Sequence, residues 1–126
     1  MKVFWDVDNT LVSPGILELR PGSIEALSTI CSLGHQNHLW SSAGRDYARL
    51  VAERVEIASY ITDYADKICP PEQEVDVVVD DDEEFLNRIS NSVNKTILIK
   101  AYHRGDDTEM GSTVQRIVGA FDSAAW

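Results

Sequence analysis

Apolar and polar stretches follow one another along the chain in a pattern that predicts strands and helices in turn. The pattern predicts strands over residues 2–7, 36–40, 75–79 and 95–102, and the stretches at 2–7 and 75–79 are apolar enough for burial on both faces. Apolar residues spaced three and four apart predict helices over residues 24–33, 45–55, 83–93 and 112–123. We expect one α/β domain over residues 1–126, with a Rossmann-like three-layer architecture and a mostly parallel central sheet.

Local signals refine two of these elements. Ser23 is expected to cap the first helix and Gly34 to end it, with Ile24, Leu27, Ile30 and Cys31 on its apolar face. Residues 59–62, "SYIT", are expected to form a further short strand.

Composition narrows the classes of function. Twenty-one acidic and eleven basic residues give a formal charge of −10, which argues against non-specific binding to nucleic acids or to anionic membrane surfaces. No apolar run approaches the roughly 20 residues that a membrane span needs, and residues 1–8 do not resemble a secretory signal. Cys31 and Cys69 are far apart and show no metal-ligand spacing, which favours a reducing compartment. We therefore expect a cytoplasmic protein.

Acidic and hydroxyl residues follow three of the predicted strands. Asp6 and Asp8 end the first, Ser41 ends the second, and Asp80–Asp82 end the strand at 75–79. Binding sites of parallel sheets lie beyond the carboxyl ends of the strands, so these residues should meet at one edge. Ionised carboxylates that lie close together repel one another, and a bound divalent cation would offset that repulsion.

These segments resemble the motifs of the haloacid dehalogenase-like (HAD) phosphohydrolases. "VFWDVDNTLV" at 3–12 is similar to the first motif, a hydrophobic strand followed by DxDxT. Ser41 is similar to the second motif, Lys67 in "ADKICP" to the third, and "VVVDDDEEF" at 77–85 to the fourth. The resemblance covers roughly residues 2–102 and implies a phosphatase that acts through an aspartyl-phosphate intermediate.

The resemblance also implies roles for the acidic residues. Asp6 would be the nucleophile that attacks phosphorus. Asp8 would protonate the leaving oxygen and then activate water as a base. Mg²⁺ would be held by the carboxylate of Asp6, the main-chain carbonyl of Asp8, and a carboxylate of Asp80 or Asp81. Because three aspartates are consecutive, the pair Asp81 and Asp82 stays open as the alternative.

Further residues would contact the phosphoryl group. Ser41 and main-chain N–H groups at a helix start would hold its oxygens, with Ser42 as the alternative to Ser41. Lys67 would supply a positive charge, although a solvated surface lysine is the other interpretation. Thr10 is expected to anchor the loop after the nucleophile and to lie at the substrate.

The intervals in which HAD enzymes carry a cap domain are short in this chain. Residues 11–22 and 63–74 leave room only for a small flap and a loop. By resemblance, capless members act on bulky phosphorylated substrates or on substrates that a partner presents. Tyr102, His103 and Arg104 follow the last strand, where they could line the opening. The sequence does not indicate the natural substrate or the oligomeric state.

Two other classes compete with a phosphatase. A response-regulator receiver domain also combines aspartates, a hydroxyl residue and a lysine, but its phosphoacceptor and its acidic pair lie on different strands. The order of Asp6, Asp8 and Lys67 favours the HAD interpretation. The remaining alternative is a catalytically idle HAD-like module that binds a metal or a partner; an acid at position 8 favours hydrolysis over it.

Overall fold

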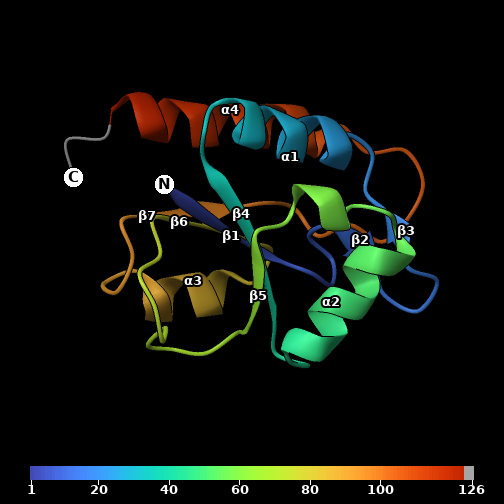
Figure 1. Cartoon of the computed structure of the whole chain (residues 1–126), viewed down its shortest axis with the longest axis horizontal. Coiled ribbons are helices and arrows are strands. Elements are labelled where there is room, and N and C mark those ends of the chain that lie inside the picture. The colour runs from blue at the N-terminus through green and yellow to red at the C-terminus, as the bar shows by residue number, and fades with distance from the viewer. Residues whose placement is uncertain (124–126) are drawn as a thin grey trace.

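The predicted alternation of strands and helices builds one central sheet between two helical layers (Figure 1). The computed structural model describes residues 1–123. The central strands are β1 (Lys2–Asp6), β4 (Gln36–Ser41), β5 (Asp63–Asp66), β6 (Val77–Asp80) and β7 (Lys95–Leu98). They are all parallel and lie in the order β5-β4-β1-β6-β7. The fold is therefore α/β and Rossmann-like, as the sequence predicts.

Helices cover both faces of this sheet. The four helices are α1 (Ser23–Ser32), α2 (Arg45–Arg54), α3 (Glu83–Ile89) and α4 (Glu109–Asp122). Figure 1 shows α1 and α4 together on one side and α3 on the other. Side chains of β1 alternate between the two apolar cores: Val3 and Trp5 join the core that includes α1, α2 and α4, whereas Phe4 joins the core that includes α3. Burial on both faces explains the unbroken apolar run of β1.

Two connections beside the carboxyl edge of the sheet are short. Residues 11–22 contain only a small antiparallel hairpin of β2 (Val12–Ser13) and β3 (Glu18–Leu19). Residues 67–76 join β5 to β6 without a helix or strand. The sheet edge beyond β1 is therefore covered by nothing larger than this hairpin within the described residues.

The structure corrects three local predictions. The residue that caps α1 is Gly22, with φ of 86°, whereas Ser23 is the first helical residue and is buried. Glycine adopts this left-handed conformation without steric cost, so it replaces a side-chain cap. Residues 59–62 do not form a strand; a 3₁₀ helix η1 (Ala58–Tyr60) precedes β5, which begins at Asp63. Ile24 and Cys31 of α1 are also exposed, so only Leu27 and Ile30 of the predicted face enter the core.

The helices and the strand predicted after β6 are present, but their first or last residues differ from the prediction. Helix α3 stops at Ile89 and β7 stops at Leu98, both earlier than the sequence suggests. Helix α4 begins at Glu109, three residues early. Within residues 1–123, none of the helices combines the length and the apolar character that crossing a bilayer requires.

Candidate functional site

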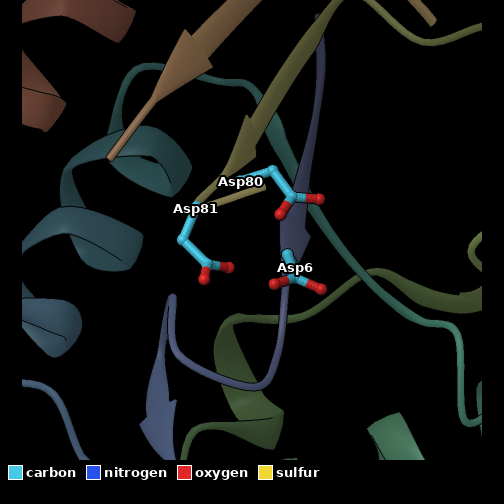
Figure 2. A group of neighbouring side chains, drawn as sticks. All are labelled: Asp6, Asp80 and Asp81. Carbon is cyan, nitrogen blue, oxygen red and sulfur yellow. The ribbon is translucent and has the colours of Figure 1, made fainter. Parts of the chain in front are cut away.

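Three carboxylates meet at the carboxyl edge of the sheet. Strands β1 and β6 are neighbours, so Asp6 and Asp80, which end them, lie side by side. Oxygen atoms of Asp6, Asp80 and Asp81 all lie within 4.8 Å of one another. Figure 2 shows the three side chains converging from the two strand ends. Asp6 is 6% exposed and Asp80 is fully buried, so water screens their repulsion poorly.

Lys67 supplies positive charge to this cluster. It follows β5, two strands away from β1, yet its Nζ lies 3.2 Å from Oδ1 of Asp6 and 2.9 Å from Oδ2 of Asp80. Burial lowers the pKa of Lys67, but the charges of Asp6 and Asp80 outweigh that effect and raise it overall. Lys67 is therefore a charged member of the cluster, and the interpretation as a solvated surface lysine is wrong.

The cluster contains more acidic groups than basic groups. Burial and the charge of Asp80 raise the pKa of Asp6 to about 8, although Lys67 opposes this shift. Burial likewise raises the pKa of Asp80, against the opposing effect of Lys67 and of the N–H of Asp82. One ammonium group thus faces three carboxylates. Hard oxygen donors in excess over the positive charge are what Mg²⁺ binds, so the donor set fits that ion.

The two neighbours of Asp80 have different positions. Asp81 joins the cluster, and its Oδ1 lies 3.2 Å from the hydroxyl of Thr10. Asp82 is the N-cap of α3 and accepts a hydrogen bond from the N–H of Phe85 at 3.2 Å. The structure therefore brings Asp80 and Asp81 to Asp6, and leaves Asp82 in a helix-capping role.

Thr10 links the turn after β1 to the carboxylates. Its buried hydroxyl lies 3.2 Å from Oδ2 of Asp6 and 3.2 Å from Oδ1 of Asp81, and it can donate to one of them at a time. Asn9 adopts φ of 67° in the preceding turn, a conformation that asparagine tolerates. Thr10 thus anchors this loop as predicted, whereas contact with a substrate stays a prediction.

Asp8 lies beside the cluster and is held by a residue of α2. The hydroxyl of Tyr47 donates a hydrogen bond of 2.6 Å to Oδ1 of Asp8. Burial, together with this hydrogen bond to Asp8, raises the pKa of Tyr47 to about 12, so the phenol keeps its proton. In the sequence, Tyr47 shows only the spacing of a core residue, because nothing local indicates which side chain its hydroxyl meets.

Ser41 and Ser42 occupy the loop between β4 and α2. Ser41 is buried, and its Oγ accepts a hydrogen bond of 3.0 Å from the N–H of Ala43. The main-chain oxygen of Ser41 accepts a hydrogen bond of 3.0 Å from the N–H of Lys67, which joins the end of β4 to the start of the loop after β5. Ser42 is exposed and faces a groove beside Lys67. Both hydroxyls lie at the predicted edge, and the choice between them as phosphoryl ligands stays a prediction.

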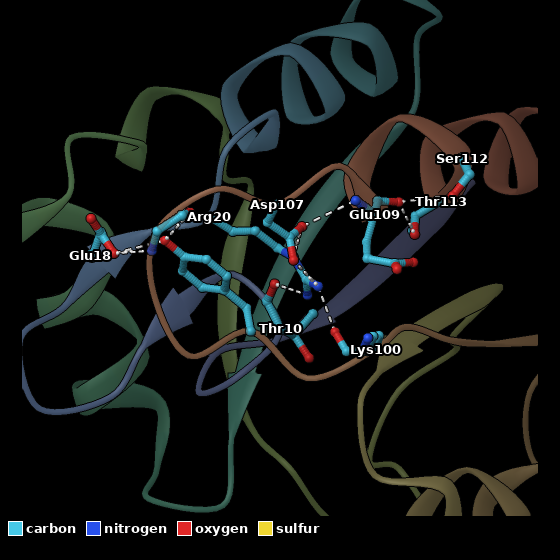
Figure 3. A network of polar contacts seen from close by, with 10 residues as sticks. Thr10, Glu18, Arg20, Lys100, Asp107, Glu109, Ser112 and Thr113 are labelled. Carbon is cyan, nitrogen blue, oxygen red and sulfur yellow. Dashed lines mark hydrogen bonds and ion pairs between the residues drawn. The ribbon is translucent and has the colours of Figure 1, made fainter.

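A buried arginine, Arg20, holds the segments around the site together, and no sequence pattern predicts this role. The side chain of Arg20 is fully buried and binds both carboxylate oxygens of Asp107, at 2.8 and 3.0 Å. It also donates to the main-chain oxygens of Thr10 and Lys100 (Figure 3). Arginine is usually exposed, so its burial here could not be expected from its residue type. Arg20 ties the hairpin, the Thr10 turn and the loop after β7 together.

Of the three residues after β7 that were expected at the opening of the site, Tyr102 instead belongs to this supporting network. Tyr102 is buried, and its hydroxyl donates a hydrogen bond of 2.8 Å to Glu18 in the hairpin. His103 is exposed. The prediction that Tyr102 lines the opening is therefore wrong, because the side chain is buried and its hydroxyl is bound to Glu18 of β3.

Comparison of the chain with models of protein families and with curated proteins finds no match.

Proposed function

We propose that the protein is a Mg²⁺-dependent phosphohydrolase that works through an aspartyl-phosphate intermediate. The observation that carries this proposal is the convergence of Asp6, Asp80, Asp81 and Lys67 at one sheet edge, with Asp8 two residues beyond Asp6. The resemblance of these segments to HAD motifs agrees with it. A cytoplasmic location, also expected from the sequence, belongs to the same proposal.

Asp6 and Asp8 would divide the chemistry between them. A carboxylate oxygen of Asp6 forms a bond to phosphorus while the bond between phosphorus and the leaving oxygen breaks. Asp8 gives a proton to that leaving oxygen. Asp8 then takes a proton from water, whose oxygen bonds to phosphorus and releases Asp6 and inorganic phosphate. Tyr47 orients Asp8 for both proton transfers through the 2.6 Å hydrogen bond.

The remaining residues would bind the metal ion and the phosphoryl group. Asp6, Asp80 and Asp81, with the main-chain carbonyl of Asp8, would hold Mg²⁺, which when bound reduces the repulsion between the anionic nucleophile and the anionic phosphate. Lys67 favours the ionised form of Asp6, which is the form that attacks. Lys67, together with Ser41 or Ser42, would contact the phosphoryl oxygens.

The exposure of this sheet edge to solvent affects which size of substrate the site could accept. Within residues 1–123, the segment inserted after β1 is no larger than the β2–β3 hairpin, so no further domain separates the site from solvent. Such a site favours a phosphomonoester that is bulky, or one that a partner protein presents, over a small substrate that must be enclosed.

Hydrolysis of p-nitrophenyl phosphate tests the proposal. We expect turnover with Mg²⁺, none in EDTA, and recovery when Mg²⁺ is restored. Asp6→Asn should abolish turnover while keeping the fold, because the change is nearly isosteric. Asp76→Asn is the matched control: Asp76 is a buried carboxylate just before β6, at the opposite edge of the sheet, and its variant should stay active. Full activity of Asp6→Asn would remove Asp6 from its role.

The alternative, an idle module that binds a metal or partner, predicts no turnover in any variant. Trapping by beryllofluoride, a mimic of the aspartyl phosphate, separates that case from a poorly matched test substrate. A Mg²⁺-dependent adduct that Asp6→Asn prevents would support a competent nucleophile. Mg²⁺ binding measured by calorimetry, with no adduct in the wild-type protein, would favour the idle module.

A further inference from the structure

A groove leads away from the candidate site along α3. Its volume is about 370 Å³, and it is lined by Ser42, Lys67, Ile68, Cys69, Asp82, Phe85 and Arg88. Because Lys67 also contacts Asp6 and Asp80, the groove begins at the carboxylate cluster. The thiol of Cys69 lies 3.6 Å from the main-chain oxygen of Arg88, so the loop after β5 is joined to the end of α3 across the groove.

Arg88 is the free positive charge of this groove. Its guanidinium lies 5.6 Å from the ring centroid of Phe85, and Nζ of Lys67 lies 4.6 Å from the same centroid. Both cations therefore flank one buried aromatic ring. Lys67 is already paired with two carboxylates, whereas Arg88 forms no ion pair and its guanidinium donates no hydrogen bond within residues 1–123.

The Arg88 side chain runs along α3 toward the start of that helix. Its guanidinium lies over Phe85, three residues earlier, which is the usual direction of a long helical side chain. That end of α3 is the end next to Asp80, so the guanidinium is directed toward the candidate site.

We propose that this groove binds a second anionic group of the substrate, so that the preferred substrate is a phosphomonoester that also carries a carboxylate or another phosphate. The planar guanidinium of Arg88 suits either anion, because its N–H groups donate in parallel to two oxygens. Asp82 is the acidic residue of the groove, and its carboxylate is occupied in capping α3. In a chain of net charge −10, Arg88 gives a polyanionic substrate a local attraction. This inference rests on the proposed function.

Binding of two matched phosphonates tests the inference without requiring turnover. The probes are 4-carboxybenzylphosphonate and its neutral counterpart 4-carbamoylbenzylphosphonate, titrated with Mg²⁺ present and followed by calorimetry. We expect the wild-type protein to bind the acid about fivefold more tightly than the amide, as for a partly exposed charge pair. The preference should shrink in high salt, because ions screen exposed charges.

Variants assign the preference to one residue. Arg88→Gln should bring the ratio of the two dissociation constants close to one, and Arg88→Glu should reverse it. Arg54→Gln is the matched control, because Arg54 is an exposed arginine in the last turn of α2; it should keep the wild-type ratio. An Arg88→Gln protein that keeps the wild-type preference would overturn the inference.

A peptide arm identifies the source of the second anion. Peptides that contain a non-hydrolysable phosphoserine analogue next to glutamate or glutamine replace the benzyl probes. A preference confined to the peptides indicates a protein substrate, and one confined to the benzyl probes indicates a small molecule; absence from both refutes the groove. A binding preference with neither hydrolysis of an aryl phosphate nor a beryllofluoride adduct would support the anion site in the groove and refute the proposed function. Hydrolysis without a preference in either probe set would do the reverse.

Discussion

Replacing Arg20 by methionine should destabilise the protein strongly, although Arg20 lies outside the carboxylate cluster. Methionine is also long and unbranched, so the change removes the charge and the donors while keeping most of the packing. It leaves Asp107 without its bidentate partner, and it leaves the main-chain oxygens of Thr10 and Lys100 without their donor. Figure 3 shows how this one side chain reaches all three.

The size of the effect follows from burial. The Arg20 side chain is 0% exposed and the Asp107 side chain 13% exposed, so this is a buried pair with little screening. Removing one partner of a buried pair costs about 3–5 kcal/mol. Since Asp107 is slightly exposed and can regain water, we expect about 3 kcal/mol, against a total stability of roughly 5–15 kcal/mol for a domain of this kind. The melting temperature should fall by roughly 10–15 °C.

Urea unfolding followed by circular dichroism gives this free-energy difference. Arg116→Met is the control, because Arg116 is an exposed arginine that donates a single hydrogen bond to Leu98; its cost should stay below about 1 kcal/mol. A double-mutant cycle with Asp107→Asn isolates the pair itself. If Arg20→Met unfolds within 1 kcal/mol of the wild-type protein, the network does not hold the Thr10 turn in the way that its contacts indicate.

Two further predictions concern the aspartates of the site. The pKa of Asp6 is raised to about 8 in the folded protein from a usual 3.8, so folding retains a proton that the unfolded chain loses between these values. We therefore expect the free energy of unfolding of the wild-type protein, relative to that of Asp6→Asn, to fall as the pH rises from 5 to 7 in EDTA. The fall should be up to about 1.4 kcal/mol per pH unit, measured by urea unfolding. A difference between the two proteins that does not depend on pH would contradict this. Tyr47→Phe keeps the ring but removes the donor to Asp8. It should lower kcat/KM for an alkyl phosphate about tenfold, and much less for p-nitrophenyl phosphate, whose leaving group needs little protonation; equal losses would refute a role through Asp8.

The pattern of apolar and polar residues is enough to predict the fold and the edge of the sheet at which the site lies. The apolar run of β1 requires burial on both faces, and a chain of alternating strands and helices satisfies that requirement with a parallel sheet. Once the strands are parallel, residues that end them share one edge. Asp6, Asp80 and Ser41 therefore lie at the edge that the strand pattern predicts.

Which side chains contact one another depends on how the strands and helices pack. Strand β6 ends at Asp80, so Asp81 joins the cluster and Asp82 begins α3 as its N-cap. Because the three residues are identical, the sequence alone does not show which of them has which position. Lys67 lies two strands from Asp6, so only the strand order shows that its side chain reaches that carboxylate. Tyr47 and Arg20 were missed for the same physical reason: hydrogen bonds between distant segments depend on how the elements pack, which no local pattern records.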